Sequence, residues 1–297
     1  MMLDYGAAAA VAMIVRTGSF EKAAKALHVT PSAISQRVKL LEERLGAVLI
    51  ERGTPCRATE KGAWLCRHMV LVEQLENNLL EQLPELGEVS KGPVTIDVAV
   101  NADSLGTWFL PAATAFAERS NVLLNIAVDD QDHTADWLKK GRVLAAVTSM
   151  SEPVAGCDVT ALGKLRYVAT ASPKFFSRYF SDGVTAATVG NAPALTFNQK
   201  DTMQQDWIAT HLSSACAPPT HWLPSTQGFI EACMLGMGWC LNPISLVQPH
   251  IQAGRLVELI PGTVADIPLY WQISRWAERQ FPDLKHHVLD IARASLL

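Results

Sequence analysis

Residues 19–42 read SFEKAAKALHVTPSAISQRVKLLE, and this stretch sets the fold of the N-terminal part of the chain. Ser19 can cap a first helix, whose alanine-rich inner face lets a second helix cross it closely. A short turn follows at His28. Thr30 then supplies a second N-cap, and Pro31 takes the first helical position, where its missing N–H costs nothing. The pattern predicts a helix-turn-helix.

The second helix of this motif has one apolar and one polar face. Its apolar spacing turns four side chains inward: Ala33, Ile34, Val38 and Leu41. Among the outward residues, Gln36 can read adenine through paired hydrogen bonds, Ser35 can donate or accept, and Lys39 can neutralise a phosphate. We therefore predict that this face enters the major groove of DNA. The alternative is a surface helical hairpin with a solvated basic face.

The charge of the chain is unevenly distributed. The net charge of the 297 residues is −4 at pH 7, which by itself does not suit a polyanionic partner. Residues 22–57, however, hold seven Lys or Arg residues against three Glu residues, so this segment has a local charge of +4. The surplus coincides with the predicted helix-turn-helix and supports double-stranded DNA as the partner.

Composition and motifs exclude several other classes of function. The chain shows no basic leader followed by an apolar segment, and no uncharged apolar stretch approaches the ~20 residues of a spanning helix. The six cysteines are scattered, without a C-x-x-C pair or a nearby H-x-x-x-H. No nucleophile, base and orienting group share a recognisable motif. We therefore expect a cytoplasmic protein with reduced thiols that is not an enzyme and needs no metal, cofactor or membrane.

Apolar spacing after residue 60 predicts a long helix that joins two identical chains. Leu65, Val72 and Leu79 recur every seven residues, as in the seam of a coiled coil. A helix packed only on its own domain is the alternative. Dimerisation is favoured because a DNA reader of this size normally works as a two-fold dimer.

Strand and helix patterns alternate in residues 91–297, after a break rich in Gly, Ser and Pro at residues 86–93. Such alternation predicts an α/β domain with a parallel sheet and right-handed crossovers. A second set of strands and helices indicates two lobes with a cleft between them. The predicted boundaries are 1–60 for the DNA-binding domain, 61–90 for the linker and dimerisation helix, and 91–297 for the regulatory domain, with lobe I at about 91–165 and 268–297 and lobe II at about 166–267.

The sequence resembles the LysR-type transcription regulators over the whole chain. Besides residues 19–42, the resemblance includes LEERLGAVLIER at residues 41–52 and RATEKG at residues 57–62. It implies a winged helix-turn-helix, a two-lobed effector domain similar to periplasmic binding proteins, dimers or tetramers, and RNA polymerase as a partner. It also implies that Arg52 and its loop form a wing directed toward the minor groove. The predicted DNA-binding residues are Thr30, Pro31, Ser32, Ser35, Gln36, Lys39, Arg52 and Arg57.

Within this family, the sequence is more similar to the branch that controls the export of lysine and arginine (the ArgP/LysG/IciA-like regulators). The most specific match is VNADSLGTWFLP at residues 100–111, and LYWQ at residues 269–272 also fits. The resemblance implies a regulator that activates a basic amino-acid exporter gene in response to lysine or arginine. The alternatives are a regulator with another small-molecule effector, a nucleoid or replication-origin binding role, and a solute-binding protein without DNA function.

The effector site is expected at the carboxyl ends of the strands, where helix N-termini and loop amides converge. A basic amino acid needs N–H or O–H donors for its carboxylate and carboxylates for its two cationic groups. Ser104 and Thr226 can supply donors, and Asp103, Asp130 and Asp201 can supply carboxylates. Helix capping is the alternative role for Asp103 and Ser104, and a solvated loop is the alternative for Asp130. The predicted effector-binding residues are Asn101, Asp103, Ser104, Asp130, Thr148, Asn198, Asp201 and Thr226.

Overall fold

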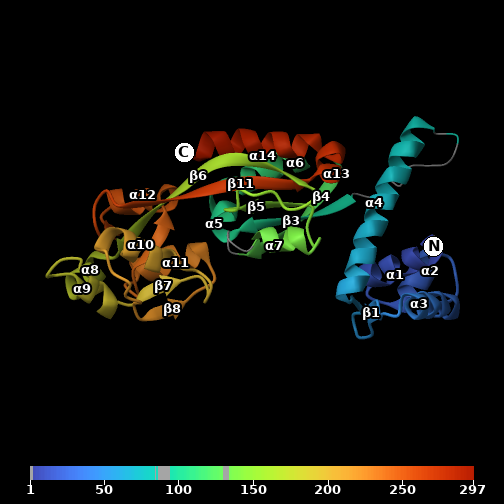
Figure 1. Ribbon diagram of the computed structural model, residues 1–297, viewed down its shortest axis with the longest axis horizontal. Coiled ribbons are helices and arrows are strands. Elements are labelled where there is room, and N and C mark those ends of the chain that lie inside the picture. Colours follow the sequence, from blue (N-terminus) through green and yellow to red (C-terminus); the bar gives the residue numbers. More distant parts are fainter. Residues whose placement is uncertain (1–2, 84, 86–93, 130–133) are drawn as a thin grey trace. The chain divides into compact units, whose positions relative to one another are not determined.

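The structure is a computed structural model that describes residues 3–83, 85, 94–129 and 134–297. The chain forms two compact units, Met1–Val94 and Thr95–Leu297 (Figure 1). The predicted linker at residues 86–93 and the predicted effector residue Asp130 lie outside the described residues.

The N-terminal unit consists of a helix-turn-helix, a two-stranded wing and a long helix. Its elements are α1 (Tyr5–Thr17), α2 (Phe20–Ala26), α3 (Pro31–Leu45), β1 (Ile50–Glu51), β2 (Arg57–Ala58) and α4 (Glu60–Gln82). Both predicted N-caps are confirmed, because the Ser19 hydroxyl accepts from the N–H of Lys22 and the Thr30 hydroxyl accepts from the N–H of Ala33. β1 and β2 pair antiparallel and form the wing.

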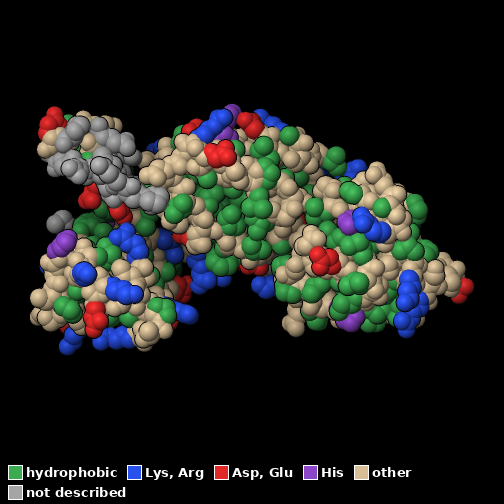
Figure 2. All heavy atoms as spheres, turned by 180° about the vertical axis from the view of Figure 1, so that it is seen from behind, with side chains coloured by type: hydrophobic (Ala, Val, Ile, Leu, Met, Phe, Trp, Pro, Cys, Tyr) green, Lys and Arg blue, Asp and Glu red, His purple; other side chains and the backbone are tan. Residues whose placement is uncertain are grey.

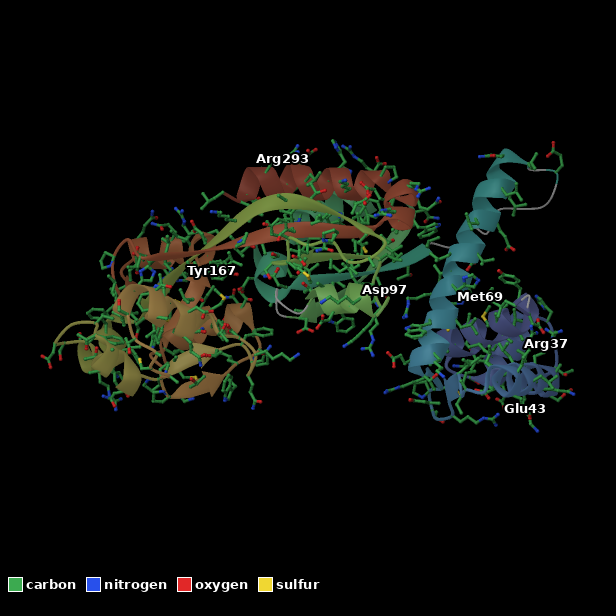
Figure 3. All side chains as sticks on the ribbon, in the orientation of Figure 1. Arg37, Glu43, Met69, Asp97, Tyr167 and Arg293 are labelled. Carbon is green, nitrogen blue, oxygen red and sulfur yellow. The ribbon has the colours of Figure 1, made fainter. Side chains whose placement is uncertain are left out.

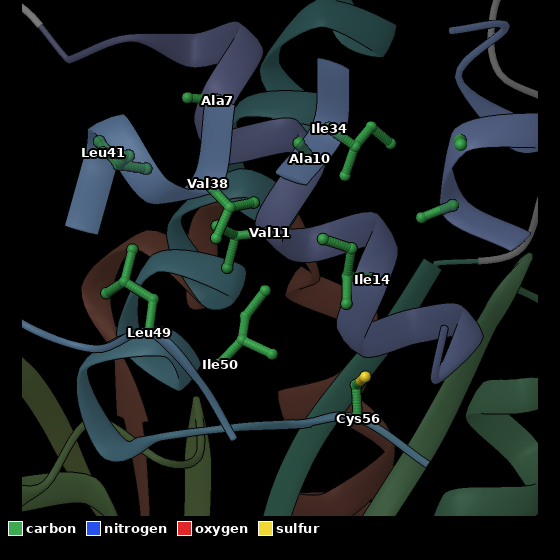
Figure 4. Packing of buried hydrophobic residues seen from close by; sticks show 12 residues of the cluster. Ala7, Ala10, Val11, Ile14, Ile34, Val38, Leu41, Leu49, Ile50 and Cys56 are labelled. Atoms are coloured by element: carbon green, nitrogen blue, oxygen red, sulfur yellow. The ribbon is translucent and has the colours of Figure 1, made fainter. Parts of the chain in front are cut away.

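A hydrophobic core holds the helices of this unit together (Figure 4). Ile14 of α1, Ile34 and Val38 of α3, and Leu49 before β1 are almost completely shielded from water. Burial of each such side chain stabilises the fold by about 1.5–3 kcal/mol. Ala33, which was expected to turn inward, is only half-buried. The inner face of α3 is therefore fixed by packing, and its outer face is left for other contacts.

Helix α4 packs against α1, and its three heptad residues have different surroundings. Leu65 packs against the core cluster of its own unit. Val72 is half-buried, whereas the Leu79 side chain is 48 % exposed. Leu65 therefore stabilises its own unit. The part of this α4 face that lies beyond Leu65 is available to contact a second chain. Dimerisation through this face stays a prediction.

The C-terminal unit contains a seven-stranded sheet of mixed direction. Its strands in spatial order are β10 (Val257–Glu258), β6 (Cys157–Ala171), β11 (Val264–Ser274), β5 (Ala145–Thr148), β3 (Val94–Asn101) and β4 (Val122–Asp129), and β9 (Cys240–Pro243) also pairs with β6. The expectation of an all-parallel sheet is wrong. β3 and β5 are parallel, but β11 runs antiparallel to both of its neighbours, β5 and β6.

This unit has two lobes, each with its own set of helices. In the first lobe, α5 (Ala102–Ser104), a π-helical turn (Leu105–Phe109) and α6 (Leu110–Ala117) follow β3, α7 (Thr134–Lys139) packs near β5, and α13 (Arg275–Gln280) and α14 (Pro282–Ser295) follow β11. α14 packs on α6, and both lie on one side of the sheet in Figure 1. The second lobe contains α8 (Pro173–Tyr179), α9 (Ala186–Asn191), β7 (Ala194–Thr196), α10 (Met203–Leu212), β8 (Thr220–Trp222), α11 (Thr226–Met234), β9 and α12 (Ile244–Gln252).

The two lobes are joined by the long strands β6 and β11. These strands pair from Val264 opposite Val168 to Ser274 opposite Cys157, with one shift of register between Leu269 and Tyr270. Both predicted lobe boundaries therefore fall inside these two strands. A two-stranded ladder thus connects the lobes.

A bidentate ion pair links the two strands of this ladder. Arg166 donates from Nε and Nη2 to the two carboxylate oxygens of Asp266, each at 2.7 Å. The guanidinium holds the pKa of the Asp266 carboxyl below its ordinary value, chiefly by hydrogen bonding. Near the ion pair, Gly163 has a φ of +131°, and a Cβ there would lie 2.8 Å from the carbonyl oxygen of Leu297. Only glycine fits this bend of β6 without strain.

We expect Gly62→Ala to destabilise the N-terminal unit, because a Cβ at residue 62 would lie 1.9 Å from the carbonyl oxygen of Leu49. Overpacking of this kind lowers the free energy of unfolding by about 1–3 kcal/mol or more. Urea unfolding followed by circular dichroism measures the change. Gly6→Ala is the matched control, since its added Cβ would meet nothing closer than 3.4 Å. Equal unfolding midpoints for the two variants would contradict the packing at Leu49.

Candidate functional site

The outer face of α3 presents the polar residues that are predicted to contact DNA. Four of them are exposed: Pro31, Ser32, Gln36 and Lys39. Ser35 is half-buried, so its hydroxyl is less accessible than expected. The exposed Thr30 hydroxyl lies 3.1 Å from the Ser32 hydroxyl at the start of the helix. Because a helix N-terminus carries a partial positive charge, this end of α3 suits a phosphate group.

Lys39 has an acidic partner on the same helix. Its Nζ lies 3.7 Å from the Glu43 carboxylate, and the two side chains are 70 % and 58 % exposed. An ion pair this exposed contributes at most about 1 kcal/mol, so a phosphate can replace Glu43 as the partner of Lys39. Arg37 is exposed as well and lies with Glu43 on the N-terminal unit (Figure 3), although the sequence did not single it out.

The wing places two further cations on this unit. The guanidinium carbon of Arg52 lies 5.3 Å from the ring centroid of Phe20, the first residue of α2. Such a cation–π contact contributes about 0.5–1 kcal/mol at an exposed position. Arg57 is exposed on β2, opposite Glu51. Figure 2 shows Lys and Arg side chains spread over the surface of the N-terminal unit. Sequence reasoning missed Phe20, because only the folded wing brings Arg52 to it.

In the C-terminal unit, Asp103 is the centre of a hydrogen-bond network. Its Oδ2 accepts from the Tyr167 hydroxyl at 2.8 Å, and its Oδ1 accepts from the Thr226 hydroxyl at 2.5 Å. Asp103 belongs to the first lobe and Thr226 to the second, while Tyr167 is on the connecting strand β6 (Figure 3). Asp103 lies inside α5, whose N-cap position is held by Asn101 without a side-chain cap bond.

A small pocket, open to solvent, adjoins Asp103 between the two lobes. Among the described residues, three carboxylates line it: Asp103 and Asp129 from the first lobe and Asp201 from the second. Its apolar lining includes the rings of Phe197 and Phe229. The structure therefore brings together Asp103 and Asp201, two predicted residues, with Asp129, which is not among the predicted effector-binding residues. Carboxylates among apolar side chains suit a cationic group on an aliphatic stem.

Hydrogen bonds orient the other two carboxylates. Asp129 Oδ2 accepts from the indole N–H of Trp137 at 2.9 Å. Asp201 accepts from the backbone N–H groups of Phe197 at 3.1 Å and Met203 at 3.0 Å, so it also shapes its own loop. A carboxylate has about four acceptor positions, and one or two bonds to the protein fix its direction while a ligand can use others.

Asn101 and Ser104 are buried near this pocket with unpaired polar groups. They are 1 % and 0 % exposed, and neither the Asn101 carboxamide nor the Ser104 hydroxyl has a hydrogen-bond partner in the described part of the chain. Buried polar groups are rarely left without a partner. A water molecule or a polar ligand group can satisfy such side chains.

The remaining predicted effector residues lie outside the pocket lining. Thr148 is buried, and its hydroxyl accepts from the N–H of Met150 at 3.2 Å. The Asn198 side-chain Oδ1 accepts from the N–H of Lys200 at 2.7 Å. Thr226 acts on the pocket through Asp103. The ligand contacts of Thr148, Asn198 and Thr226 stay predictions.

Cysteine chemistry near the pocket is suppressed. Burial raises the pKa of the Cys240 thiol well above its ordinary value, and the neighbouring Cys233 thiol and the Asp103 charge raise it further. Cys240 therefore stays a neutral thiol at neutral pH. Within the described ranges, no group of three or more His, Cys, Asp and Glu side chains is placed to hold a metal ion, and no helix is long and apolar enough to cross a membrane.

Two family models match the chain. Residues 7–63 match the model described as bacterial regulatory helix-turn-helix protein, lysR family. Residues 90–292 match the model described as LysR substrate binding domain. The first match lies in the N-terminal unit, and nearly all of the second lies in the C-terminal unit.

Relatives match the chain over most or all of its length. The chain is 42 % identical over 270 residues to the HTH-type transcriptional regulator LysG of Mycobacterium tuberculosis, which covers 91 % of this chain and 87 % of that protein. The crystal structure of ArgP from Mycobacterium tuberculosis matches with a TM-score of 0.80 at 39 % identity, over 99 % of both chains. Full-length LysG from Corynebacterium glutamicum with bound effector Arg matches with a TM-score of 0.66 at 34 % identity, again over 99 % of both chains.

The α3 face yields a prediction about DNA recognition. Gln36→Ala should cost about 1–3 kcal/mol on a specific site and relax the preference for one base pair, because it removes a base contact. Lys39→Ala should weaken binding to all sequences alike and reduce the slope of log affinity against log salt by about one, because it removes a phosphate contact. Fluorescence anisotropy on a duplex selected from a random pool and on its scrambled version measures both effects. Equal losses on the two duplexes for both variants would refute the assignment.

Proposed function

Because this chain belongs to the LysR family of bacterial transcription regulators, we propose that it activates a basic amino-acid exporter gene when lysine or arginine binds its C-terminal unit. Members of this family are DNA-binding regulators and not enzymes. The effector, the target gene and the sign of regulation are the proposed part. The observation that carries the proposal is the group of three carboxylates around one pocket between the lobes.

The charge of this pocket favours a cationic ligand. Asp103, Asp129 and Asp201 repel one another in a partly dry space, and a cation among them relieves that repulsion. A guanidinium or ammonium group also makes charge-assisted hydrogen bonds, which are about twice as strong as neutral ones. A neutral aromatic ligand would offer these carboxylates no opposite charge. Phe197 and Phe229 offer apolar surface to the methylene stem that lysine and arginine share.

The carboxylate of an amino acid needs donors, and the structure holds unused ones beside the pocket. The Ser104 hydroxyl and the Asn101 carboxamide are buried and unpaired among the described residues. They also lie at the start of the helical segment that begins at Ala102, where the partial positive charge of the helix favours an anion. Ligand binding would thus satisfy groups that are costly to leave unpaired.

Relatives support the same ligand class. The Corynebacterium glutamicum LysG structure contains bound effector Arg, and it covers almost the whole of this chain at 34 % identity. The carboxylates described here accept hydrogen bonds from either an ammonium or a guanidinium group. Lysine and arginine are therefore both part of the proposal.

The proposed effector acts through the link between the lobes. Asp103 joins the first lobe to Thr226 of the second and to Tyr167 of β6. A cation at Asp103 competes for this carboxylate and so changes the relative stability of different lobe arrangements. Because a ligand shifts an equilibrium only through its differential affinity, the output is a changed assembly of DNA-binding units in a dimer or tetramer. RNA polymerase is the proposed partner that reads this change.

Calorimetry with the purified full-length chain tests the effector. Lysine and arginine should each release heat, and Asp103→Asn should weaken binding about tenfold or more, because loss of a hydrogen bond to a charged group costs about 1.5–3 kcal/mol. Asp182→Asn is the matched control, since Asp182 is exposed in the second lobe and loses the same charge. Both variants should bind DNA as the wild type does without ligand, because neither residue belongs to the N-terminal unit.

The result also separates the parts of the proposal. No heat with either amino acid, together with a clear response to another metabolite, would refute the effector and leave the family assignment intact. Transcript profiling of a deletion strain grown with lysine or arginine tests the target, and unchanged transcripts of every amino-acid exporter would refute the proposed gene.

Assembly through α4 is tested by a double substitution. Val72→Lys with Leu79→Lys should reduce both the dimer mass in light scattering and the affinity for DNA, because two charges enter an apolar seam. Glu73→Lys is the control, because the exposed Glu73 lies beside this seam on the same helix. An unchanged oligomer in the double variant would show that α4 does not join the chains through this face.

A further inference from the structure

We infer that Glu42 is a positioning residue for DNA recognition, which fixes the wing to the recognition helix α3 and thereby sets the spacing between the contacts of α3 and those of the wing. Glu42 is half-buried on α3. Its Oε1 accepts from the N–H of Leu49 at 2.7 Å and from the N–H of Ile50 at 3.3 Å. Ile50 is the first residue of the wing strand β1. A single carboxylate oxygen therefore holds the backbone that leads into the wing.

The same backbone is held from its other side by the residues before α4. The carbonyl oxygen of Leu49 accepts from the N–H of Thr59 at 3.0 Å, and the carbonyl oxygen of Val48 accepts from the Thr59 hydroxyl at 2.8 Å. The Leu49 side chain is 2 % exposed, so it cannot move without opening the core. With its carbonyl fixed here and its N–H fixed by Glu42, Leu49 has little freedom to change the direction of β1.

The consequence reaches the arginine of the wing. Arg52 follows Ile50 by two residues, and its guanidinium lies over the Phe20 ring. Gln36 precedes Glu42 by six residues on the same helix, which corresponds to about 9 Å along the helix axis. The predicted base contact at Gln36 and the wing cation at Arg52 are thus connected through one rigid path. Binding to a site that needs both contacts at once requires no further ordering of the wing, which lowers the entropic cost of recognition.

A purely structural role of Glu42 would affect stability without affecting which bases are read, so the test measures base preference. Glu42→Gln keeps the shape of the side chain but replaces a charge-assisted acceptor by a weaker neutral one. Glu43→Gln is the matched control, because it removes the same charge from the next residue of α3. Glu43 is exposed and pairs with Lys39 and not with the wing backbone.

The starting probe is a duplex that the wild-type chain selects from a random pool. In two further versions of it, the A·T pairs whose minor groove the bound protein protects are replaced by I·C pairs or by G·C pairs. An I·C pair lacks the guanine amino group and therefore resembles A·T in the minor groove. Weaker binding to the G·C duplex, without weaker binding to the I·C duplex, therefore measures the minor-groove contact of the wing. The wild type and Glu43→Gln should bind the A·T and I·C duplexes alike and the G·C duplex more weakly. Glu42→Gln should lower this preference at least threefold, and its preference at the base pairs read by α3 should not change.

A double-mutant cycle with Arg52→Ala completes the test, because two residues that act through one contact give non-additive losses. Arg52→Ala alone should remove the preference against G·C, and adding Glu42→Gln should then cause no further loss. Glu42→Asp, which withdraws the carboxylate by one methylene, replaces Glu42→Gln if that variant lacks the helical circular dichroism of the wild type. A folded Glu42 variant with wild-type preference, additive losses in the cycle, or a wild type that does not discriminate against G·C would each overturn the inference.

Discussion

The antiparallel pairing of β6 with β11 is the interaction on which the C-terminal unit depends. These strands are the longest in the sheet, and they continue from the first lobe into the second. β5 and β3 extend the sheet on the β11 side, whereas β9 and β10 pair with the other end of β6. The Arg166–Asp266 ion pair and the bend at Gly163 lie on this ladder. Because both lobes share the same two strands, a change in their relative position must bend or twist one common element.

This construction explains why the pocket is placed where it is. Tyr167 belongs to β6, so its hydroxyl brings the Asp103 carboxylate to the strand that both lobes share. Thr226 adds a bond from the start of α11 in the second lobe. The Asp103 carboxylate therefore links α5, β6 and α11. A cation that binds this carboxylate competes with its hydrogen bonds inside the protein. The same contact can recognise a ligand and transmit its presence, provided that the ligand prefers one lobe arrangement over another.

In the N-terminal unit, by contrast, most contacts join residues that are close to one another in the sequence. Small residues in α2, the caps at Ser19 and Thr30, and the core around Ile34 and Val38 fix the recognition helix within about fifty residues of chain. Two of its cations are exposed, Lys39 in a weak ion pair with Glu43 and Arg52 over the ring of Phe20. A rigid unit with loosely held cations suits an anionic polymer, because phosphates can replace the weak partners without refolding the unit.

The sequence by itself determined the elements whose signals are local. The caps of α2 and α3, the basic segment around α3 and the alternation of strands and helices can all be read from neighbouring residues, because capping and hydrophobic periodicity act over a few positions. The resemblance of residues 100–111 also led to Asp103. Only the tertiary structure decided the antiparallel direction of β11, the joining of Asp103 and Asp201 with Asp129, and the contacts of Tyr167, Phe20 and Glu42. Many of these depend on packing between residues far apart in the chain, and one sequence carries no local signal for such partners.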